Sequence, residues 1–209
     1  MMTTADGSKN GAATATRFAP GPRWRFVEAF LREPLSVGSL WPSSTELSWA
    51  IVDGCDFNPG ATVVELGPGT GAFTGLLLDR LGDDGRLLAL ELSPTNVSEL
   101  RRRYPHCQVI HDNAENLTQH LEPNRADCVV SGLAWGNMRP ATQDRILEAI
   151  LDSLAPGGQF LTFAYTHAIW LPTSRRFRRK LMQHFSRVEK TPVVWRNLPP
   201  AFVYRCWRD

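Results

Sequence analysis

Three glycines at alternate positions follow a short apolar run at residues 61–66: Gly67, Gly69 and Gly71. Glycines at such a place let the backbone turn sharply and approach a ligand closely. A glycine-rich turn between a strand and a helix can be purely structural, but three alternating glycines directly after a buried run favour a ligand site. Glu65 lies two residues before the first glycine, so a carboxylate is expected beside the same ligand.

A second carboxylate, that of Glu91, ends the next apolar run and narrows the choice of ligand. The first two glycines and Ala72 satisfy the GxGxxG/A pattern of dinucleotide-binding folds, in which a later acidic residue binds the ribose. Glu65, however, would repel a pyrophosphate but suit a cationic amino acid. The C-terminal hairpin expected below is also absent from the usual dinucleotide fold. The motif therefore favours another nucleoside ligand, and a nicotinamide-dependent dehydrogenase is the weakest candidate.

Strand-like apolar runs alternate with helix-like segments along most of the chain. Strands that alternate with helices of about 10–15 residues indicate βαβ units around a parallel sheet. The last two strands are joined by residues 196–200, a connection short enough for an antiparallel hairpin. We therefore expect an α/β fold: a mostly parallel seven-stranded sheet that closes with an antiparallel hairpin. The expected strands are residues 61–66, 86–91, 108–111, 126–131, 159–164, 187–195 and 201–207, and the expected helices between them are residues 72–81, 94–104, 140–154 and 174–185.

Two helices are expected before this sheet. Residues 23–33 have an apolar helical face, and a second helix is expected from Ser43, because Ser43 and Glu46 match a capping box. Residues 1–20 are small and polar, lack the apolar segment of a signal peptide and are expected to form a disordered tail.

Charge is distributed unevenly along the chain. The sequence holds 23 basic and 21 acidic residues, a net charge of +2. Residues 1–138 hold 11 basic and 16 acidic side chains, whereas residues 139–209 hold 12 and 5. The near-neutral total argues against a protein that binds nucleic acid by charge alone, so we expect no nucleic-acid partner.

The four cysteines lie far apart, without a CxxC pair or histidines at metal-binding spacing. A zinc site and a disulfide framework are therefore not expected. Reduced thiols indicate a cytoplasmic protein.

Glu65 followed by Gly67–Gly71 resembles the signature of class I S-adenosylmethionine (SAM)-dependent methyltransferases, an acidic residue followed by GxGxG. The resemblance implies SAM as cofactor, S-adenosylhomocysteine (SAH) as its product and no metal. It implies that Glu65 and the glycine loop hold the methionine part, and that Glu91 binds both ribose hydroxyls, as the two oxygens of a carboxylate can. The implied cofactor residues are Glu65, Gly67, Pro68, Gly69, Thr70, Gly71, Glu91, Leu92, Asp112, Asn113, Ala114, Ser131 and Gly132.

One position in that set is open. Asn113 stands where the family usually has an aspartate, and its amide oxygen can accept a hydrogen bond from the adenine amino group. Asp112, directly before it, is the alternative. Ser131 and Gly132 follow a later strand and would line the other side of the cofactor.

The order of several motifs narrows the resemblance to the soluble bacterial phospholipid N-methyltransferases, which methylate phosphatidylethanolamine. It covers the chain from about residue 26 to the end, and its most specific parts are Ser131-Gly132-Leu133 and Asn197-Leu198-Pro199-Pro200-Ala201. The ribosomal RNA adenine dimethyltransferases are more distant, because residues 131–135 lack their Asn-Leu-Pro-Tyr-like catalytic loop. Residues 134–138 depart from the phospholipid enzymes, which usually have Pro after Ser-Gly-Leu, and this loop is expected to face the acceptor.

Three side chains near the C-terminus are candidates for the acceptor site. An amine must be neutral to attack a methyl group, so a nearby hydrogen-bond acceptor or base would help. Tyr165 is the first catalytic candidate, followed by His167 and Tyr204. Each of these residues also has a purely structural interpretation. A tyrosine in a strand usually packs its ring in the core with its hydroxyl in water, and a histidine near Trp170 is often structural.

Residues 175–181 place five basic side chains around two apolar ones. Such a run is usually the solvated face of a helix, but near an anionic surface each basic residue contributes about 1 kcal/mol of attraction. The helix at residues 23–33 is expected to lie in the membrane interface, to cover the cofactor as a lid, or to do both.

The sequence thus predicts a SAM-dependent methyltransferase that acts on an amine of a phospholipid, such as phosphatidylethanolamine, at the membrane surface. The alternatives are a soluble small-molecule or natural-product methyltransferase and a non-catalytic SAM- or nucleoside-binding protein. The expected partners are a lipid or small-molecule amine and an anionic membrane, contacted peripherally from the cytoplasm. A single domain is expected over residues 21–209, with lid or membrane-contact helices at residues 21–56 and a catalytic core at residues 57–209.

Overall fold

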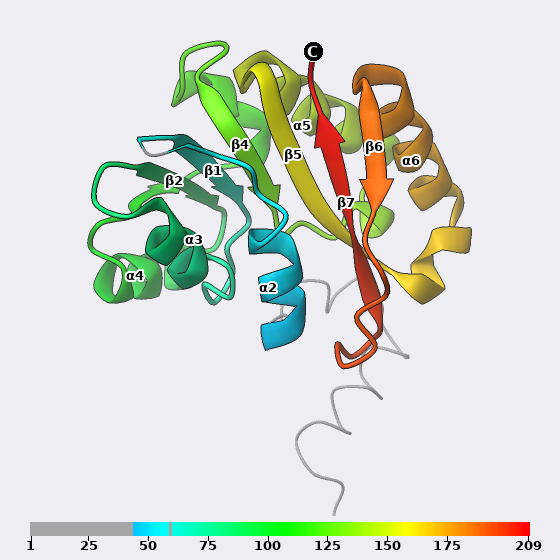
Figure 1. Cartoon of the computed structure of the whole chain (residues 1–209), viewed down its shortest axis with the longest axis horizontal. Coiled ribbons are helices and arrows are strands. Elements are labelled where there is room, and N and C mark those ends of the chain that lie inside the picture. Colours follow the sequence, from blue (N-terminus) through cyan, green and yellow to red (C-terminus); the bar gives the residue numbers. More distant parts are fainter. Residues whose placement is uncertain (1–43, 59) are drawn as a thin grey trace, which may run out of the picture. The chain divides into compact units, whose positions relative to one another are not determined.

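A computed structural model describes residues 44–58 and 60–209. These residues contain a seven-stranded sheet of order β3-β2-β1-β4-β5-β7-β6, shown in Figure 1. Strands β1 to β5 run parallel, and β7 pairs antiparallel with both β5 and β6. The strands are β1 (Thr62–Leu66), β2 (Arg86–Glu91), β3 (Gln108–His111), β4 (Ala126–Ser131), β5 (Leu154–Tyr165), β6 (Arg187–Lys190) and β7 (Ala201–Trp207). The predicted mostly parallel sheet with an antiparallel C-terminal part is confirmed.

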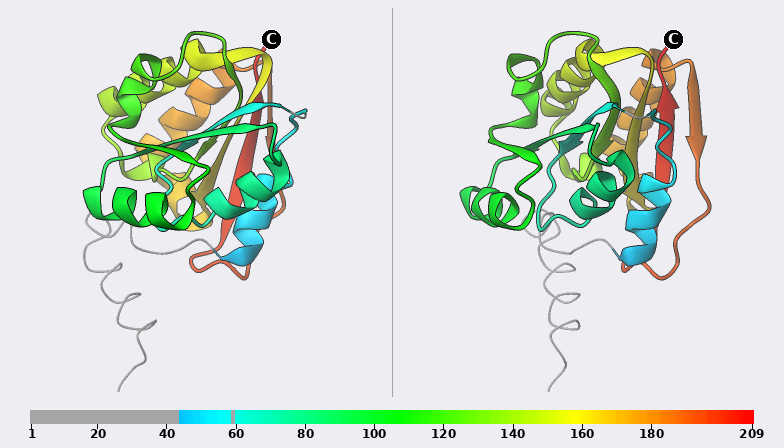
Figure 2. Two further views of the ribbon diagram at one scale, coloured as in Figure 1. Left: turned by 90° about the vertical axis from the view of Figure 1, so that its left-hand side faces the viewer. Right: turned by 60° about the vertical axis from the view of Figure 1, so that its left-hand side comes forward.

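Helices cover both faces of this sheet, as Figure 2 shows. One buried cluster joins α5, α6 and η1 to one face, and a second joins α2, α3 and α4 to the other. Because both faces are covered, the central strands are apolar nearly throughout, as parallel strands usually are. The helices are α2 (Thr45–Val52), α3 (Thr74–Leu81), α4 (Pro94–Arg103), α5 (Pro140–Ser153) and α6 (Pro172–His184), with short 3-10 helices η1 (Ala114–Gln119), η2 (Trp135–Asn137) and η3 (Thr166–Trp170).

The predicted start of the second helix is wrong by one residue. The hydroxyl of Ser44, not Ser43, accepts a hydrogen bond from the amide of Leu47 at 3.1 Å and caps α2. The amide of Ser44 in turn donates to the Asn197 side-chain oxygen at 2.9 Å. A long-range contact therefore fixes this end of the helix, which local spacing does not reveal.

Two strand boundaries also differ from expectation. β6 ends at Lys190 rather than at residue 195. The Thr191 amide still donates to the Val203 carbonyl at 3.0 Å, but the Val203 amide donates to the Thr191 hydroxyl at 2.9 Å instead of to the backbone, so the regular ladder stops. Beyond it, only an isolated bridge joins Val194 to Ala201 within the described chain. β5 begins at Leu154, five residues before the predicted start, and its pairing with β4 shifts register between Ala126 and Cys128.

The predicted tail at residues 1–20 and the predicted helix at residues 23–33 lie outside the described residues. So does most of the expected lid or membrane-contact segment. Within the part of the chain that the structure describes, no helix has the length and apolar character needed to cross a membrane.

Candidate active site

The glycine loop lies where the sheet topology favours a ligand. β1 and β4 are neighbours, but the chain continues from β1 to β2 on one side and from β4 to β5 on the other. The carboxyl ends of the strands at such a switch point form a crevice in α/β sheets. The loop after β1 and the loop after β4 therefore face the same crevice.

The loop has the backbone that its glycines predict. Gly67, Gly69 and Gly71 have φ values of 66°, 58° and 84°, a region that residues with a side chain rarely adopt. A Cβ atom at Gly69 would meet nothing within 4 Å, so the backbone there borders open space. A Cβ atom at Gly132 would lie 2.5 Å from the Gly67 carbonyl oxygen. The loops after β1 and β4 thus pack together at a position that only glycine fits.

Glu65 is fully buried beneath this loop. Its Oε2 accepts a hydrogen bond from the Thr74 hydroxyl at 2.7 Å, whereas Oε1 has no partner among the described residues. Burial raises the pKa of this carboxyl to about 8. A buried polar atom without a partner is costly, so Oε1 fits a ligand that brings a donor or a positive charge.

Glu91 lies directly against the loop. Its Oε2 accepts from the Gly69 amide at 2.9 Å, and its Oε1 accepts from the Ser93 amide at 2.8 Å. The carboxylate is 7% exposed, whereas the next side chain, Leu92, is 66% exposed. Each carboxylate oxygen retains a lone pair for a further donor, so the site can still bind hydroxyl groups.

Asp112 and Asn113, which the sequence did not separate, have different environments. Asp112 accepts three hydrogen bonds, from the Asn113 amide, the Asn116 side chain and His120 Nε2 at 2.6 Å. The His120 contact, with the other two, lowers the pKa of Asp112 to about 2. Among the described residues, the Asn113 oxygen accepts only from the Glu115 amide, at 3.1 Å, and it caps η1. The bonds of Asp112 hold η1 in place, and Ala114 is buried behind them.

Ser131 connects the loop region to a second hollow. Its buried hydroxyl accepts from the Leu133 amide at 3.3 Å and from Trp135 Nε1 at 3.1 Å. Trp135 stacks on Phe177 at 4.2 Å and lines a pocket of about 220 Å³. Phe163 also lines this pocket and makes an edge contact with Phe73, next to the glycine loop. The pocket therefore adjoins the crevice at the β1/β4 switch point.

The structure brings two of the three acceptor-site candidates into this pocket. Tyr165 and Tyr204 line it, and burial raises the pKa of both phenols. His167 stacks on the Tyr165 ring at 5.7 Å, and burial lowers its pKa. At neutral pH all three side chains are therefore uncharged, so the tyrosines can accept hydrogen bonds but are poor bases.

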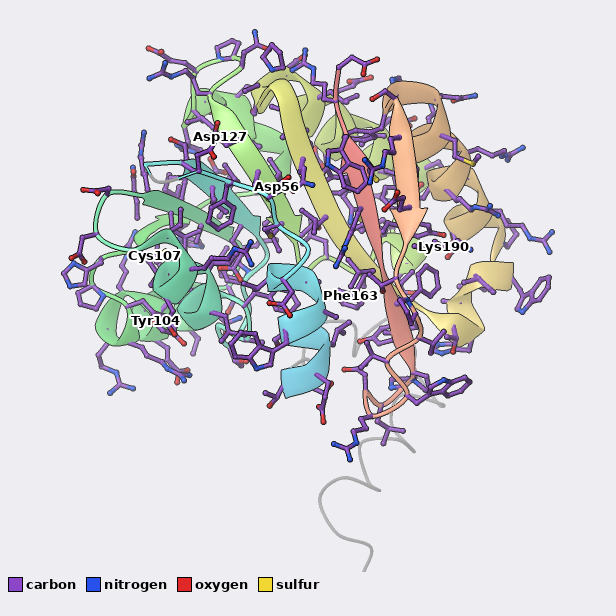
Figure 3. All side chains as sticks on the ribbon, in the orientation of Figure 1. Asp56, Tyr104, Cys107, Asp127, Phe163 and Lys190 are labelled. Atoms are coloured by element: carbon purple, nitrogen blue, oxygen red, sulfur yellow. The ribbon has the colours of Figure 1, made fainter. Side chains whose placement is uncertain are left out.

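The lining residues that sequence reasoning did not single out include Trp135 and Lys190. Trp135 carried a signal as a large apolar residue in a loop expected to face the acceptor, and it is almost wholly buried. Lys190, at the end of the edge strand β6 (Figure 3), carried no such signal because charged residues are common on edge strands. No cluster of His, Cys, Asp and Glu within the described ranges is placed to hold a metal ion.

Comparisons with known proteins agree with this geometry. A family model described as a methyltransferase domain matches residues 63–158. The chain is 33% identical over 187 residues to an ornithine lipid N-methyltransferase of Singulisphaera acidiphila, covering 87% of this chain and 93% of the relative. It is 38% identical over 93 residues to ribosomal RNA small subunit methyltransferase A of Cupriavidus metallidurans, covering 43% of this chain but 32% of that one.

The fold has solved counterparts. A SAM-dependent O-methyltransferase from Thermotoga maritima superposes with a TM-score of 0.60 at 15% identity, over 88% of this chain and 71% of that one. A parallel sheet with β7 inserted antiparallel between β5 and β6 defines the Rossmann-like methyltransferase fold. The chain belongs to the class I SAM-dependent methyltransferases. It is an enzyme, and neither the nicotinamide-dependent nor the non-catalytic alternative remains.

Proposed function

We propose that this enzyme transfers a methyl group from SAM to an amine of a lipid headgroup, such as that of phosphatidylethanolamine, at a membrane surface. One observation carries the proposal: a pocket lined largely by aromatic side chains adjoins the glycine-loop crevice, with the Tyr165 and Tyr204 side chains on its wall. The similarity to a relative named for a lipid N-methyltransferase supports it.

The residues at the crevice fit SAM. Glu65 offers a buried carboxyl oxygen without a partner, suited to the amino group of methionine, and the open space at Gly69 admits a ligand. Glu91 binds the ribose hydroxyls. Asn113 rather than Asp112 contacts adenine, because the carboxylate of Asp112 already accepts three hydrogen bonds. The remaining lining is assigned to Pro68, Thr70, Gly71, Leu92, Ala114, Ser131 and Gly132.

When bound, SAM supplies an electrophilic methyl group on a sulfonium sulfur, so the protein mainly positions the acceptor and excludes water. The acceptor nitrogen reacts as the free amine, and groups that accept hydrogen bonds from its N–H orient its lone pair toward the methyl group. Tyr165 and Tyr204 hold the amine through their phenol oxygens. His167 stacks on the Tyr165 ring and holds that side chain in position, and the proton that the nitrogen loses passes to solvent.

The size of the pocket bears on the acceptor. A volume of about 220 Å³ admits a headgroup but not the acyl chains of a lipid. The chains must then remain outside the protein, as they do when an enzyme works on a lipid that stays in its bilayer. The same size would suit a small soluble amine, which is the second candidate acceptor.

The test is to incubate the enzyme with labelled SAM and liposomes that contain phosphatidylethanolamine and an anionic lipid. Parallel samples contain ornithine lipid or soluble ethanolamine, and Glu91→Ala serves as the inactive control. Label in the lipid fraction supports the proposal. Label in ethanolamine alone, with SAM binding intact, would identify a small-molecule methyltransferase instead.

A further inference from the structure

The basic run predicted at residues 175–181 lies on α6 and divides between two sides of that helix. Arg176 and Lys180 face α5 and pair with Asp144, at 2.6 Å and 3.7 Å. Arg175 and Arg178 lie on another side and line the pocket beside the glycine-loop crevice. Side chains three residues apart share a helical side, so this separation follows from helix geometry.

A third cation reaches the same pocket from the sheet. Lys190 of β6 lines it and places its amine 5.2 Å from the Phe202 ring centre and 5.9 Å from that of Tyr204. Arg175 similarly lies over Trp170, at 5.5 Å. Two consecutive elements, α6 and β6, therefore bring three positive charges to one mostly aromatic hollow.

Among the described residues, no acidic side chain balances these charges. No acidic side chain lines the pocket, and within residues 44–58 and 60–209 none of the three cations forms an ion pair. Burial, and then the positive charge of Arg178, lowers the pKa of Lys190. Cations that only face solvent would be expected to spread apart, because like charges repel. Their convergence indicates a ligand that carries a negative charge.

We propose that Arg175, Arg178 and Lys190 bind an anionic group of the acceptor, a phosphate or carboxylate joined to the reactive amine. This inference rests on the proposed function and names its substrate class: zwitterionic headgroups. A simple alkylammonium would enter the pocket against three positive charges. A headgroup with its own anion satisfies them, and charge-assisted hydrogen bonds from arginine would orient it with the amine beside Tyr165.

The test compares two acceptors that differ in the anion. Lysophosphatidylethanolamine, used as monomers below its micelle concentration, carries a phosphate, and an alkylamine of equal chain length does not. We expect Arg175→Gln and Arg178→Gln each to raise the KM for the lysolipid about tenfold, the loss of one charge-assisted hydrogen bond. The KM for the alkylamine should not rise, and it should fall if the lost positive charge had opposed the binding of the ammonium. Arg179→Gln, on the same helix but outside the pocket, is the matched control and should change nothing.

A binding measurement separates this inference from the proposed function. Calorimetric titration with lysophosphatidylethanolamine in the presence of SAH measures binding to the anion site without turnover. The Arg178→Gln variant should bind the lysolipid about tenfold more weakly than the wild type does. If the wild type methylates neither acceptor, the proposed function fails while this titration still decides the anion site.

Three results would overturn the anion site. The first is an equal loss for the lysolipid and the alkylamine, or no loss for either. The second is inorganic phosphate that binds as tightly as the lysolipid, which would indicate a site for free phosphate. The third is a loss seen only in attachment to anionic liposomes, which would assign the arginines to the bilayer surface.

Discussion

The Oε2 atom of Glu91 accepts a hydrogen bond from the amide of Gly69 at 2.9 Å, so one carboxylate both shapes the glycine loop and borders the crevice. Replacing Glu91 with Gln removes the charge and weakens both functions. We expect the Kd for SAM to rise at least about tenfold, the loss of one hydrogen bond to a charged group. Calorimetry with SAM measures this change. Glu99→Gln on the exposed side of α4 should leave the Kd unchanged, and an unaltered Kd in the Glu91 variant would contradict the assignment.

Gly132→Ala should destabilise the protein. The new Cβ atom would lie 2.5 Å from the Gly67 carbonyl oxygen, so the loops after β1 and β4 must separate. Overpacking of this kind costs about 1–3 kcal/mol of unfolding free energy. Denaturant unfolding measures the loss, with Thr95→Ala on α4 as the control. A variant as stable as the wild type, with the same Kd for SAM, would show that the two loops do not depend on their close contact.

Stability in the absence of SAM should fall as the pH rises toward 8. Burial raises the pKa of Glu65 from 4.5 to about 8, so between these values the folded state binds more protons than the unfolded state. The unfolding free energy therefore decreases with pH across that window. Glu65→Gln, which stays neutral, should flatten this part of the profile. Urea unfolding from pH 5 to 9 measures how the unfolding free energy depends on pH. The control variant Glu99→Gln should keep the wild-type dependence. A Glu65→Gln variant that also keeps the wild-type dependence would contradict the prediction.

The Trp135→Phe substitution tests the hydrogen bond that joins a pocket residue to Ser131 at the crevice. The variant loses the hydrogen bond from Nε1 to Ser131, while a ring remains to stack on Phe177. A lost buried hydrogen bond costs about 1 kcal/mol of unfolding free energy. The KM for the acceptor should rise severalfold while the Kd for SAM stays within about twofold. Trp195→Phe, at a side chain that is 76% exposed, should alter neither value.

We expect a substitution of Asn197 to lower the stability of the protein. Its side chain is 1% exposed, accepts from the Ser44 amide at 2.9 Å and donates to the Pro199 carbonyl at 2.7 Å. Asn197→Ala leaves buried groups without partners, which costs about 1–3 kcal/mol. Thermal unfolding measures this, against Gln183→Ala on the exposed side of α6. An unchanged midpoint would mean that the loop before β7 does not hold α2.

The central sheet was predictable because the residue pattern of each strand lies within that strand's own segment of the sequence. Buried parallel strands need apolar residues on both faces, so residues 86–91 and 126–131 were located correctly at both ends. The edge strand at residues 108–111 was also located correctly, although its two end residues are polar and exposed. The glycine loop was equally visible, since alternating glycines and Glu65 are neighbours in sequence. β6 was predicted too long because its pattern continued past Thr191, whose hydroxyl takes the Val203 amide that would otherwise continue the ladder.

The acceptor pocket was harder to predict because no local pattern defines it. Trp135, Phe163, Arg178 and Lys190 belong to four elements and meet only when the sheet is complete. The basic run on α6 was visible, but its division between Asp144 and the pocket depends on where α5 lies. The N-cap at Ser44 likewise depends on Asn197, which is distant in sequence.

The insertion of β7 between β5 and β6 has a consequence for the order of assembly. β6 pairs with β7 alone, so this edge of the sheet cannot form until β7 has been synthesised. The glycine loop, Glu91 and Ser131 belong to strands translated earlier, whereas Tyr204 and the positioning of Lys190 await β7. The strands on either side of the glycine-loop crevice are therefore synthesised before the strand that completes the aromatic pocket.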